Sequence, residues 1–276
     1  MGNWSLRSFV GMIALALPAP VLASGEAVRD ALRLDETLEI VRSEGIRDAE
    51  GLVDGPFGEG LGRGWERRVA EIYAMDRMRD IFADPFDASI DALKPGRVAD
   101  ILDFFEDGVG ADAVALETSA RAALLDEAVE EGARAVLAGK RDDDDPRLDR
   151  IETFVEASNL IDGNVAAALN STMAFHRAMI AGAGDALDLD EADVRGFARA
   201  REPAIRENSE DWVLTFLTLA YGPLSDAELE ELIAFARSPA GRDLNAALFA
   251  AYDTLFTTLS GEVGRAAGQA VGGSEL

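Results

Sequence analysis

Apolar residues recur at intervals of three and four along most of the chain, which is the spacing of one face of an α-helix. Runs that alternate between apolar and polar residues, as β-strands require, are nearly absent. The helical spacing is clearest in residues 93–124 and 224–255, and these two segments align with each other without a gap. We therefore predict an all-α protein.

The two aligned segments share packing and turn residues rather than chemically reactive ones. The identical pairs are Leu93/Leu224, Phe104/Phe235, Gly110/Gly241, Asp112/Asp243, Ala115/Ala246, Ala120/Ala251 and Leu124/Leu255. Each segment carries an apolar stripe, a turn and a second apolar stripe, which predicts an antiparallel helix pair. The predicted fold is two diverged helical repeats packed as a helical bundle or array.

Polar residues mark where the helices of these segments begin. Ser225 followed by Glu228 has the spacing of a capping box, in which each side chain bonds to the other residue's backbone amide. Ser238 precedes a proline and is expected to cap the second helix of its segment. Asp107 stands at the equivalent position of the first segment and is expected to cap in the same way.

A charged stretch separates the two halves of the chain. Residues 140–146 contain four aspartates and end in a proline, which predicts a solvated acidic linker. Residues 33–41 and 147–155 both begin with Arg-Leu-Asp and end in Val, so the duplication extends further back. We place an N-terminal diverged repeat at residues 24–139 and a C-terminal repeat at residues 147–276.

The first 23 residues have the three-part layout of a secretory signal peptide. Arg7 precedes an apolar run from Phe9 to Leu17, and small residues follow up to Ala23. The alternative is an uncleaved membrane anchor, but this run is shorter than the roughly 20 residues that span a bilayer. We predict cleavage near Ala23, a periplasmic protein, and no stable membrane insertion after cleavage.

The overall charge argues against nucleic acid as a partner. The chain has 52 acidic and 26 basic residues, and its formal net charge is −26. Binding of nucleic acid needs clustered Lys and Arg on a phosphate-tracking surface. The chain also has no cysteine, which excludes disulfides and thiolate metal sites.

The C-terminal segment carries a motif that resembles a known family. The run LSDAELEELIAFARSPAGRDL, from residue 224, resembles the bacterial domain-of-unknown-function family numbered 2059, with residues 93–124 as a diverged second copy. The residues that match the family motif are Ala234, Phe235, Ser238, Pro239, Gly241 and Arg242. Ala236 replaces the aromatic residue usual there. The resemblance implies an exported, all-helical bacterial protein, and it brings no established activity and no catalytic residues.

His176 is the only histidine, so metal sites built from two or three histidines are excluded. It falls on the apolar stripe of a predicted helix with Leu169 and Ile180. A catalytic histidine needs an orienting acid and a nucleophile beside it. We therefore favour a partly buried helix histidine over a catalytic one.

Clusters of acidic residues do not have the spacing of a calcium loop. Residues 142–145 and 185–193 lack the glycine at position six and the glutamate at position twelve of an EF-hand. Asp190 with Asp193 is better explained as the capped start of a helix. We predict no metal and no cofactor.

Several acidic residues have an arginine four positions later, which predicts ion pairs on solvated helix surfaces. These pairs are Glu117 with Arg121, Glu130 with Arg134, and Glu191 with Arg195.

One weak ligand-binding site is suggested by the turn of the second segment. Arg237 and Arg242 flank Ser238 and Gly241, and a helix start beside two guanidinium groups can hold an anion. The first segment has Glu106 and Ala111 at the arginine positions, which favours a purely structural turn.

The sequence contains no arrangement of residues that predicts a reaction. We expect an exported, non-enzymatic binding or scaffolding module whose partner is a protein or an apolar ligand in the periplasm. One alternative is a helical hydrolase or lyase that uses carboxylates in the cleft between the repeats. The other is a carrier of a small apolar ligand.

Overall fold

The computed structural model describes residues 25–54, 61, 64–187 and 189–273, and these residues form helices and turns with no β-strand. This confirms the prediction of an all-α protein. The α-helices are α1 (Gly25–Ala31), α2 (Leu34–Glu50), α4 (Trp65–Ile72), α5 (Met75–Asp91), α6 (Pro95–Phe105), α7 (Gly108–Ala123), α8 (Glu127–Asp142), α9 (Pro146–Ala157), α10 (Leu160–Ala183), α11 (Glu191–Ala220), α12 (Asp226–Arg237) and α13 (Pro239–Val271), and the 3₁₀ turns are η1 (Gly51–Asp54) and η2 (Gly184–Ala186).

Residues 1–23, the predicted signal peptide, lie outside the described residues. Within the described ranges, no helix combines the length and the apolar character needed to cross a membrane.

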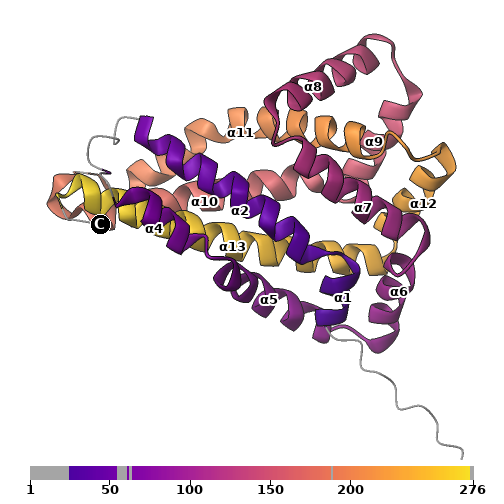
Figure 1. Cartoon of the computed structure of the whole chain (residues 1–276), viewed down its shortest axis with the longest axis horizontal. Helices are drawn as coiled ribbons and strands as arrows, with labels where there is room; N and C mark the ends of the chain where they lie inside the picture. The colour runs from indigo at the N-terminus through magenta and orange to yellow at the C-terminus, as the bar shows by residue number, and fades with distance from the viewer. Residues whose placement is uncertain (1–24, 55–60, 62–63, 188, 274–276) are drawn as a thin grey trace, which may run out of the picture.

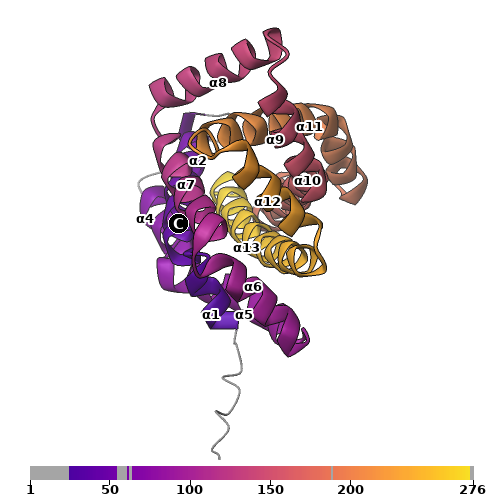
Figure 2. The same ribbon diagram turned by 90° about the vertical axis from the view of Figure 1, so that its right-hand side faces the viewer.

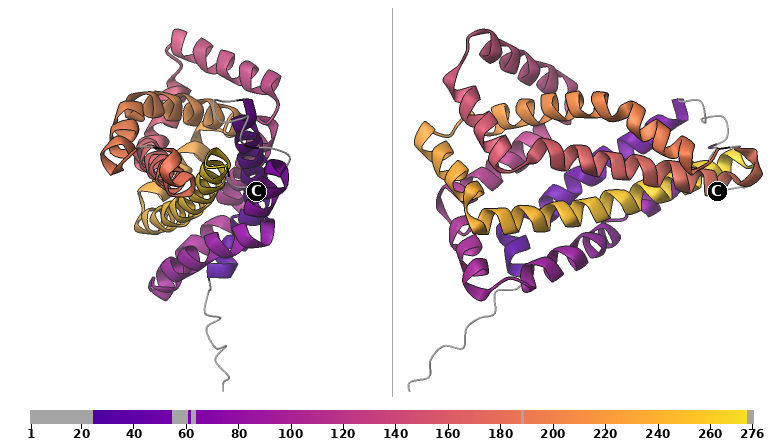
Figure 3. Two further views of the ribbon diagram at one scale, coloured as in Figure 1. Left: turned by 90° about the vertical axis from the view of Figure 1, so that its left-hand side faces the viewer. Right: turned by 180° about the vertical axis from the view of Figure 1, so that it is seen from behind.

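Three long helices run along the length of the molecule. Helices α10 and α13 lie side by side, and α11 packs along α10 (Figures 1 and 3). Helices α4, α5 and α6 contact α13, whereas α7, α8 and α9 contact α11. Seen from the end in Figure 2, α8 stands on the outside of the molecule. The helices α4–α9 therefore form two groups, one against α13 and the other against α11, and α2 contacts members of both groups, α5 and α7.

Glycines bring α10 and α13 into backbone contact. A methyl group added at Gly264 would stand 2.2 Å from the carbonyl oxygen of Phe175, and one added at Gly268 would stand 2.0 Å from that of Met179. Neither distance leaves room for a Cβ atom. The two helices can therefore pack at this distance only with glycine at these positions.

Two apolar clusters form the core. One is built around Phe82 and Phe86 of α5 and extends over α1, α2, α4, α6 and α13. The other is built around Tyr221, which caps the end of α11, and Ile233 of α12, and it extends over α7, α8, α9 and α11. Each cluster contains residues from both sides of the 140–146 stretch. The predicted halves therefore share their cores and form one body.

The linker between the predicted halves is shorter than the sequence suggested. Lys140–Asp142 continue α8, so only residues 143–145 connect it to α9. The Asp145 side chain accepts a hydrogen bond from the Arg147 backbone amide at 2.9 Å and pairs with Lys140 at 2.5 Å. The aspartate that seemed part of a solvated linker is thus the cap of α9.

The predicted helix caps are confirmed in the C-terminal segment. The Glu228 amide donates to Ser225 Oγ at 3.3 Å, and the Ser225 amide donates to Glu228 Oε2 at 2.6 Å. The Gly241 amide donates to Ser238 Oγ at 3.0 Å. Asp107 makes no side-chain cap, so that prediction is wrong. The residue after it, Gly108, has a φ of 69°, and the chain enters α7 through this left-handed turn instead.

Replacing Ser225 with alanine is expected to lower the free energy of unfolding by about 1 kcal/mol, because the amide and the carboxylate of Glu228 both lose their hydrogen bond to the Ser225 hydroxyl. Urea unfolding followed by circular dichroism measures this. Ser119→Ala is the control, since Ser119 is exposed and bonds only within its own helix, to the Ala115 carbonyl. Equal losses for the two variants would contradict a capping role for Ser225.

The aligned segments lie against each other in the structure. The rings of Phe104 and Phe235, which occupy equivalent positions, stack with centroids 3.9 Å apart and planes 4° apart. A methyl group added at Gly110 would meet the Phe104 carbonyl oxygen at 2.1 Å, and one added at Gly241 would meet that of Phe235 at 2.2 Å. In both turns, therefore, the glycine lies equally close to the backbone of the preceding helix. The helices that follow differ in length, since α13 has 33 residues and α7 has 16.

Candidate ligand-binding cavity

A cavity of about 720 Å³ lies between the two apolar clusters, and members of both line it. Helices α2, α6, α7, α8, α9, α10, α11, α12 and α13 contribute to its wall. Arg47 and Asp48 of α2 are exposed residues of this wall, so the cavity reaches the surface there. Well-packed protein interiors seldom contain voids larger than a water molecule. A cavity of this size is therefore the main candidate for a functional site.

Aromatic rings form much of the cavity wall. The ten aromatic residues are Phe104, Phe105, Phe154, Trp212, Phe216, Tyr221, Phe235, Phe249, Tyr252 and Phe256. Phe105 meets the Phe235 ring edge-on at 5.2 Å, and Trp212 stacks on Phe216 at 5.2 Å. These contacts between rings hold the aromatic wall in a defined shape.

A small group of polar side chains interrupts the apolar wall. The Tyr221 hydroxyl donates to Glu117 Oε1 at 2.5 Å. Arg121 forms a two-bond ion pair with Glu44, from Nε at 3.1 Å and from Nη2 at 2.7 Å. These side chains come from α2, from α7 and from the residue that follows α11, so three helices must pack together before the group exists.

Arg121 also contacts the aromatic wall. Its guanidinium carbon lies 5.4 Å from the centre of the Trp212 ring, within the range of a cation–π interaction. The cavity wall therefore already places one cation against an aromatic face.

The cavity environment changes the ionisation of these groups. Burial raises the pKa of Glu117 above its usual value, and the hydrogen bond from Tyr221 opposes part of that rise. Burial raises the pKa of Tyr252 to about 12 and that of Tyr221 well above 10. Glu117 is enclosed by protein yet keeps accessible surface, because it borders the cavity. Its carboxyl group can therefore act as either donor or acceptor toward a ligand.

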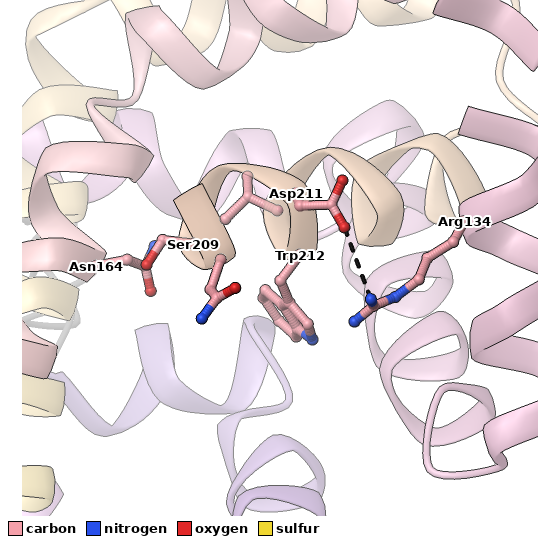
Figure 4. A pocket seen from close by; sticks show the side chains of 7 residues that line it. Arg134, Asn164, Ser209, Asp211 and Trp212 are labelled. Atoms are coloured by element: carbon pink, nitrogen blue, oxygen red, sulfur yellow. Dashed lines mark ion pairs between the residues drawn. The ribbon is translucent and has the colours of Figure 1, made fainter. Parts of the chain in front are cut away.

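A smaller, more polar depression of about 340 Å³ lies beside the cavity and shares Asn164, Trp212 and Val213 with it. Figure 4 shows Arg134 of α8 reaching toward Asp211 of α11 across this depression, and the two form an ion pair at 3.9 Å. Trp212 therefore forms a boundary between the apolar cavity and a polar surface.

The ion pairs predicted from the four-residue spacing are confirmed for Glu130 with Arg134, at 2.7 Å, and for Glu191 with Arg195, at 3.5 Å. The prediction for Glu117 and Arg121 is wrong. Instead of a solvated surface pair, the two side chains line the cavity and bond to residues from other helices, as described above.

The residues of the anion-site hypothesis do not all lie at the cavity. Gly241 lines it, whereas Arg237 and Arg242 are exposed. Arg242 Nη1 donates to the Arg237 carbonyl oxygen, and the Ser238 hydroxyl caps the Gly241 amide. The turn therefore already uses some of the groups that an anion would need. Anion binding at this turn stays a prediction.

His176 is half-buried, as predicted, and it does not line the cavity. Its Nδ1 lies 2.8 Å from the Thr172 carbonyl oxygen, and its ring lies 5.5 Å from that of Phe197. Among the described residues, no group of three or more His, Asp and Glu side chains is placed to hold a metal ion.

The sequence indicated Glu117 and Arg121 only as a surface ion pair, and it gave no indication that Tyr221 and Trp212 line a cavity with them. The four residues are separated by up to 104 positions, and no short motif connects them. The signal that was available is the density of aromatic residues in α11 and α13, although such residues are equally typical of an ordinary core.

Comparison with known proteins adds no assignment. No family model matches the chain, and no curated protein or solved structure is significantly similar to it. The resemblance to the domain-of-unknown-function family numbered 2059 stays a prediction from the C-terminal motif.

Proposed function

We propose that this protein is a non-enzymatic binding protein that carries a small apolar ligand in the cavity between its two clusters. The observation that carries the proposal is the cavity itself, about 720 Å³ with ten aromatic side chains in its wall. Small-molecule sites measure about 300–1,000 Å³ and combine apolar walls with a few polar groups. An apolar occupant would restore the packing that the cavity lacks.

The polar groups of the wall support a ligand with one polar end. Glu117 uses one carboxyl oxygen for Tyr221, which leaves the other for a ligand. The hydroxyl of Tyr252 belongs to the same neighbourhood, because Glu117, Arg121 and Glu44 all influence its pKa. A few fixed hydrogen-bonding groups in an apolar pocket orient a ligand without adding much to the area of contact.

The cellular setting of this proposal rests on the sequence. The pattern of residues 1–23 supports export to the periplasm, where an apolar molecule needs a carrier to cross an aqueous space. The matching turns at Gly110 and Gly241, together with the Phe104–Phe235 stack, support the hypothesis of two diverged repeats. The cavity would then have formed between the two repeats.

A carboxylate-dependent hydrolase or lyase is the second candidate, and the raised pKa of Glu117 favours it as a general acid. The two functions predict different effects of Glu117→Gln. In an enzyme this change abolishes turnover of a bound molecule, whereas in a carrier the molecule is released unchanged by both proteins. Mass spectrometry of molecules extracted from the purified protein, before and after prolonged incubation, distinguishes the two outcomes.

The carrier function can be tested with a neutral, apolar fluorescent probe such as N-phenyl-1-naphthylamine. We expect a single strong site, and we expect Ala167→Trp to weaken it at least about tenfold by filling the cavity. Ala167 lines the cavity from α10. The neighbouring Ala166 is exposed, so Ala166→Trp is the matched control and should bind the probe normally.

Two outcomes would contradict the carrier function. The first is the absence of probe binding to the full chain. The second is an equal effect of the two tryptophan variants when circular dichroism shows that both are folded. Thermal unfolding gives an independent measurement, because a ligand that binds only the folded protein raises its Tm.

A further inference from the structure

The ionisable groups of the cavity wall carry an excess of negative charge. Four carboxylic acids but only two arginines line it: Glu44, Asp48, Glu117, Glu130, Arg47 and Arg121. Arg121 is engaged by Glu44, and Glu130 is engaged by Arg134, which lies outside the cavity. Partial burial raises the pKa of Asp48 at the cavity mouth, and the nearby Glu44 adds to that rise.

Two of the four acids, Asp48 and Glu117, form no ion pair among the described residues, and whereas Asp48 is exposed, Glu117 is partly buried. Its one hydrogen bond within the described part of the chain comes from Tyr221, a neutral donor, and no ion pair there includes it. Arg121 is one helical turn further along α7, but both bonds of its ion pair go to Glu44. The carboxyl group of Glu117 therefore faces the cavity without a compensating charge.

The aromatic wall suits a positively charged group. Ring faces attract cations, most strongly where water is excluded. Trp212 already has the Arg121 guanidinium against its face, the Tyr221 hydroxyl bonds to Glu117, and Tyr252 is a further ring of the cavity wall. A carboxylate among aromatic rings offers a cation both an ion pair and cation–π contacts.

We propose that the ligand of this cavity is a lipophilic amine, whose ammonium group pairs with Glu117 and whose apolar part lies among the aromatic rings. This inference rests on the proposed carrier function and identifies the class of ligand. An anionic amphiphile, such as a fatty acid, would find Arg121 already paired with Glu44 and would face Glu117 as a like charge. The other arginine of the wall, Arg47, lies at the exposed mouth of the cavity and donates to the Leu125 carbonyl oxygen. The net charge of −26 also favours the approach of cations over anions.

Three probes with the same chain length test the class of ligand: decylammonium, decanol and decanoate, each titrated into the full chain by calorimetry below its micelle concentration. We expect decylammonium to bind about tenfold more tightly than decanol, because one charge-assisted hydrogen bond typically strengthens binding by about that factor. Decanoate should bind most weakly. Ethylammonium carries the same charge without the long apolar chain, and it should not bind measurably. Its failure to bind would show that decylammonium binding is not simply attraction of a cation to an acidic surface.

Glu117→Gln should reduce decylammonium binding to the level of decanol and leave decanol unchanged. The control is Glu127→Gln on α8, since Glu127 is exposed and does not line the cavity. It should bind all three probes like the unmodified chain.

The unmodified protein provides a second test that does not depend on the variant folding. Protonation of Glu117 in acid should weaken decylammonium binding while decanol binding stays constant. The other charged or titratable groups of the cavity wall are Tyr221, Tyr252, Glu44, Asp48, Glu130, Arg47 and Arg121. The raised pKa values keep both tyrosines neutral in acid, and Arg121 stays charged. If the pH dependence of decylammonium binding comes from Glu117 and not from another acid such as Glu44, the Glu117→Gln variant should lack it.

The outcomes distinguish the two proposals. If decanol or decanoate bound as tightly as decylammonium, or if amine binding did not change with pH, the amine inference would be wrong and the carrier function would stand. If none of the three probes bound, the carrier function itself would fail. Preferential amine binding that depends on Glu117 supports both.

Discussion

Replacing Gly268 with alanine is expected to lower the free energy of unfolding by about 2–3 kcal/mol, because the new methyl group would force two long helices apart. The added Cβ would stand 2.0 Å from the carbonyl oxygen of Met179, which is backbone and cannot rotate away. Helices α10 and α13 contact each other along most of their length, so the displacement would affect the core on both sides. Urea unfolding at constant pH measures the loss.

Gly261→Ala provides a control of opposite sign in the same helix. The nearest atom to a methyl group at this position is the Ala174 carbonyl oxygen, at an ordinary contact distance of 3.9 Å. Alanine is the better helix former, so this change should raise the free energy of unfolding by about 0.5–1 kcal/mol. If both alanines stabilised the protein, or if both destabilised it equally, the close contact at Gly268 would not limit the packing.

The features that the sequence predicted are those that local chemistry determines. A serine cap and its glutamate partner are three residues apart, so Ser225 and Glu228 were recognisable without knowledge of the fold. The apolar stripe of α12, formed by residues such as Leu229 and Ile233, is likewise a property of one helix, and it is buried as predicted. Local signals therefore predicted the fold class and the capped starts of α11, α12 and α13.

The contact between α10 and α13 was not predicted, although its residues follow a regular spacing. Gly264, Gly268 and Gly272 occur at every fourth position and lie on one face of a helix. The glycine spacing indicates a helix face without side chains, but it does not indicate which other helix packs against that face. The partner backbone, at residues such as Phe175 and Met179, lies in a different helix far away in the chain.

The site could not be predicted because a local rule indicated the wrong partners. Glu117 and Arg121 have ideal spacing for a pair on one helix, and in isolation they would form it. In the folded protein Arg121 bonds to Glu44, 77 positions away, and Glu117 bonds to Tyr221, 104 positions away. Tertiary packing therefore determines which side chains enter the cavity.

Two properties of the cavity, its aromatic wall and its buried acid, restrict which ligands could occupy it. Its aromatic wall favours an apolar occupant, while Glu117 adds one acid whose charge is costly to bury. A purely structural cavity would have no use for such a group. A ligand that supplies a donor or a cation would satisfy the acid and fill the space at the same time.

Replacing Tyr221 with phenylalanine is expected to cost about 2–3 kcal/mol of unfolding free energy where Glu117 is ionised, and about 1 kcal/mol in acid. In acid only a hydrogen bond between neutral groups is lost. At higher pH a buried carboxylate loses its donor. Tyr252→Phe is the matched control, since it changes a cavity tyrosine that does not bond to Glu117, and it should have a small effect at both pH values.

The pH dependence has a definite sign. The folded-state pKa of Glu117 is raised above its usual value of 4.5, so its stabilising contribution is complete below pH 4.5 and is lost as the pH rises through the folded-state pKa. The hydrogen bond from Tyr221 lowers that pKa, so Tyr221→Phe raises it further and increases the loss. Glu117→Gln removes this component, and in that background Tyr221→Phe should cost the same at every pH. Urea unfolding of the four proteins between pH 4 and pH 9 measures the effect, and an unchanged pH dependence in Tyr221→Phe would show that this hydroxyl does not stabilise the Glu117 carboxylate.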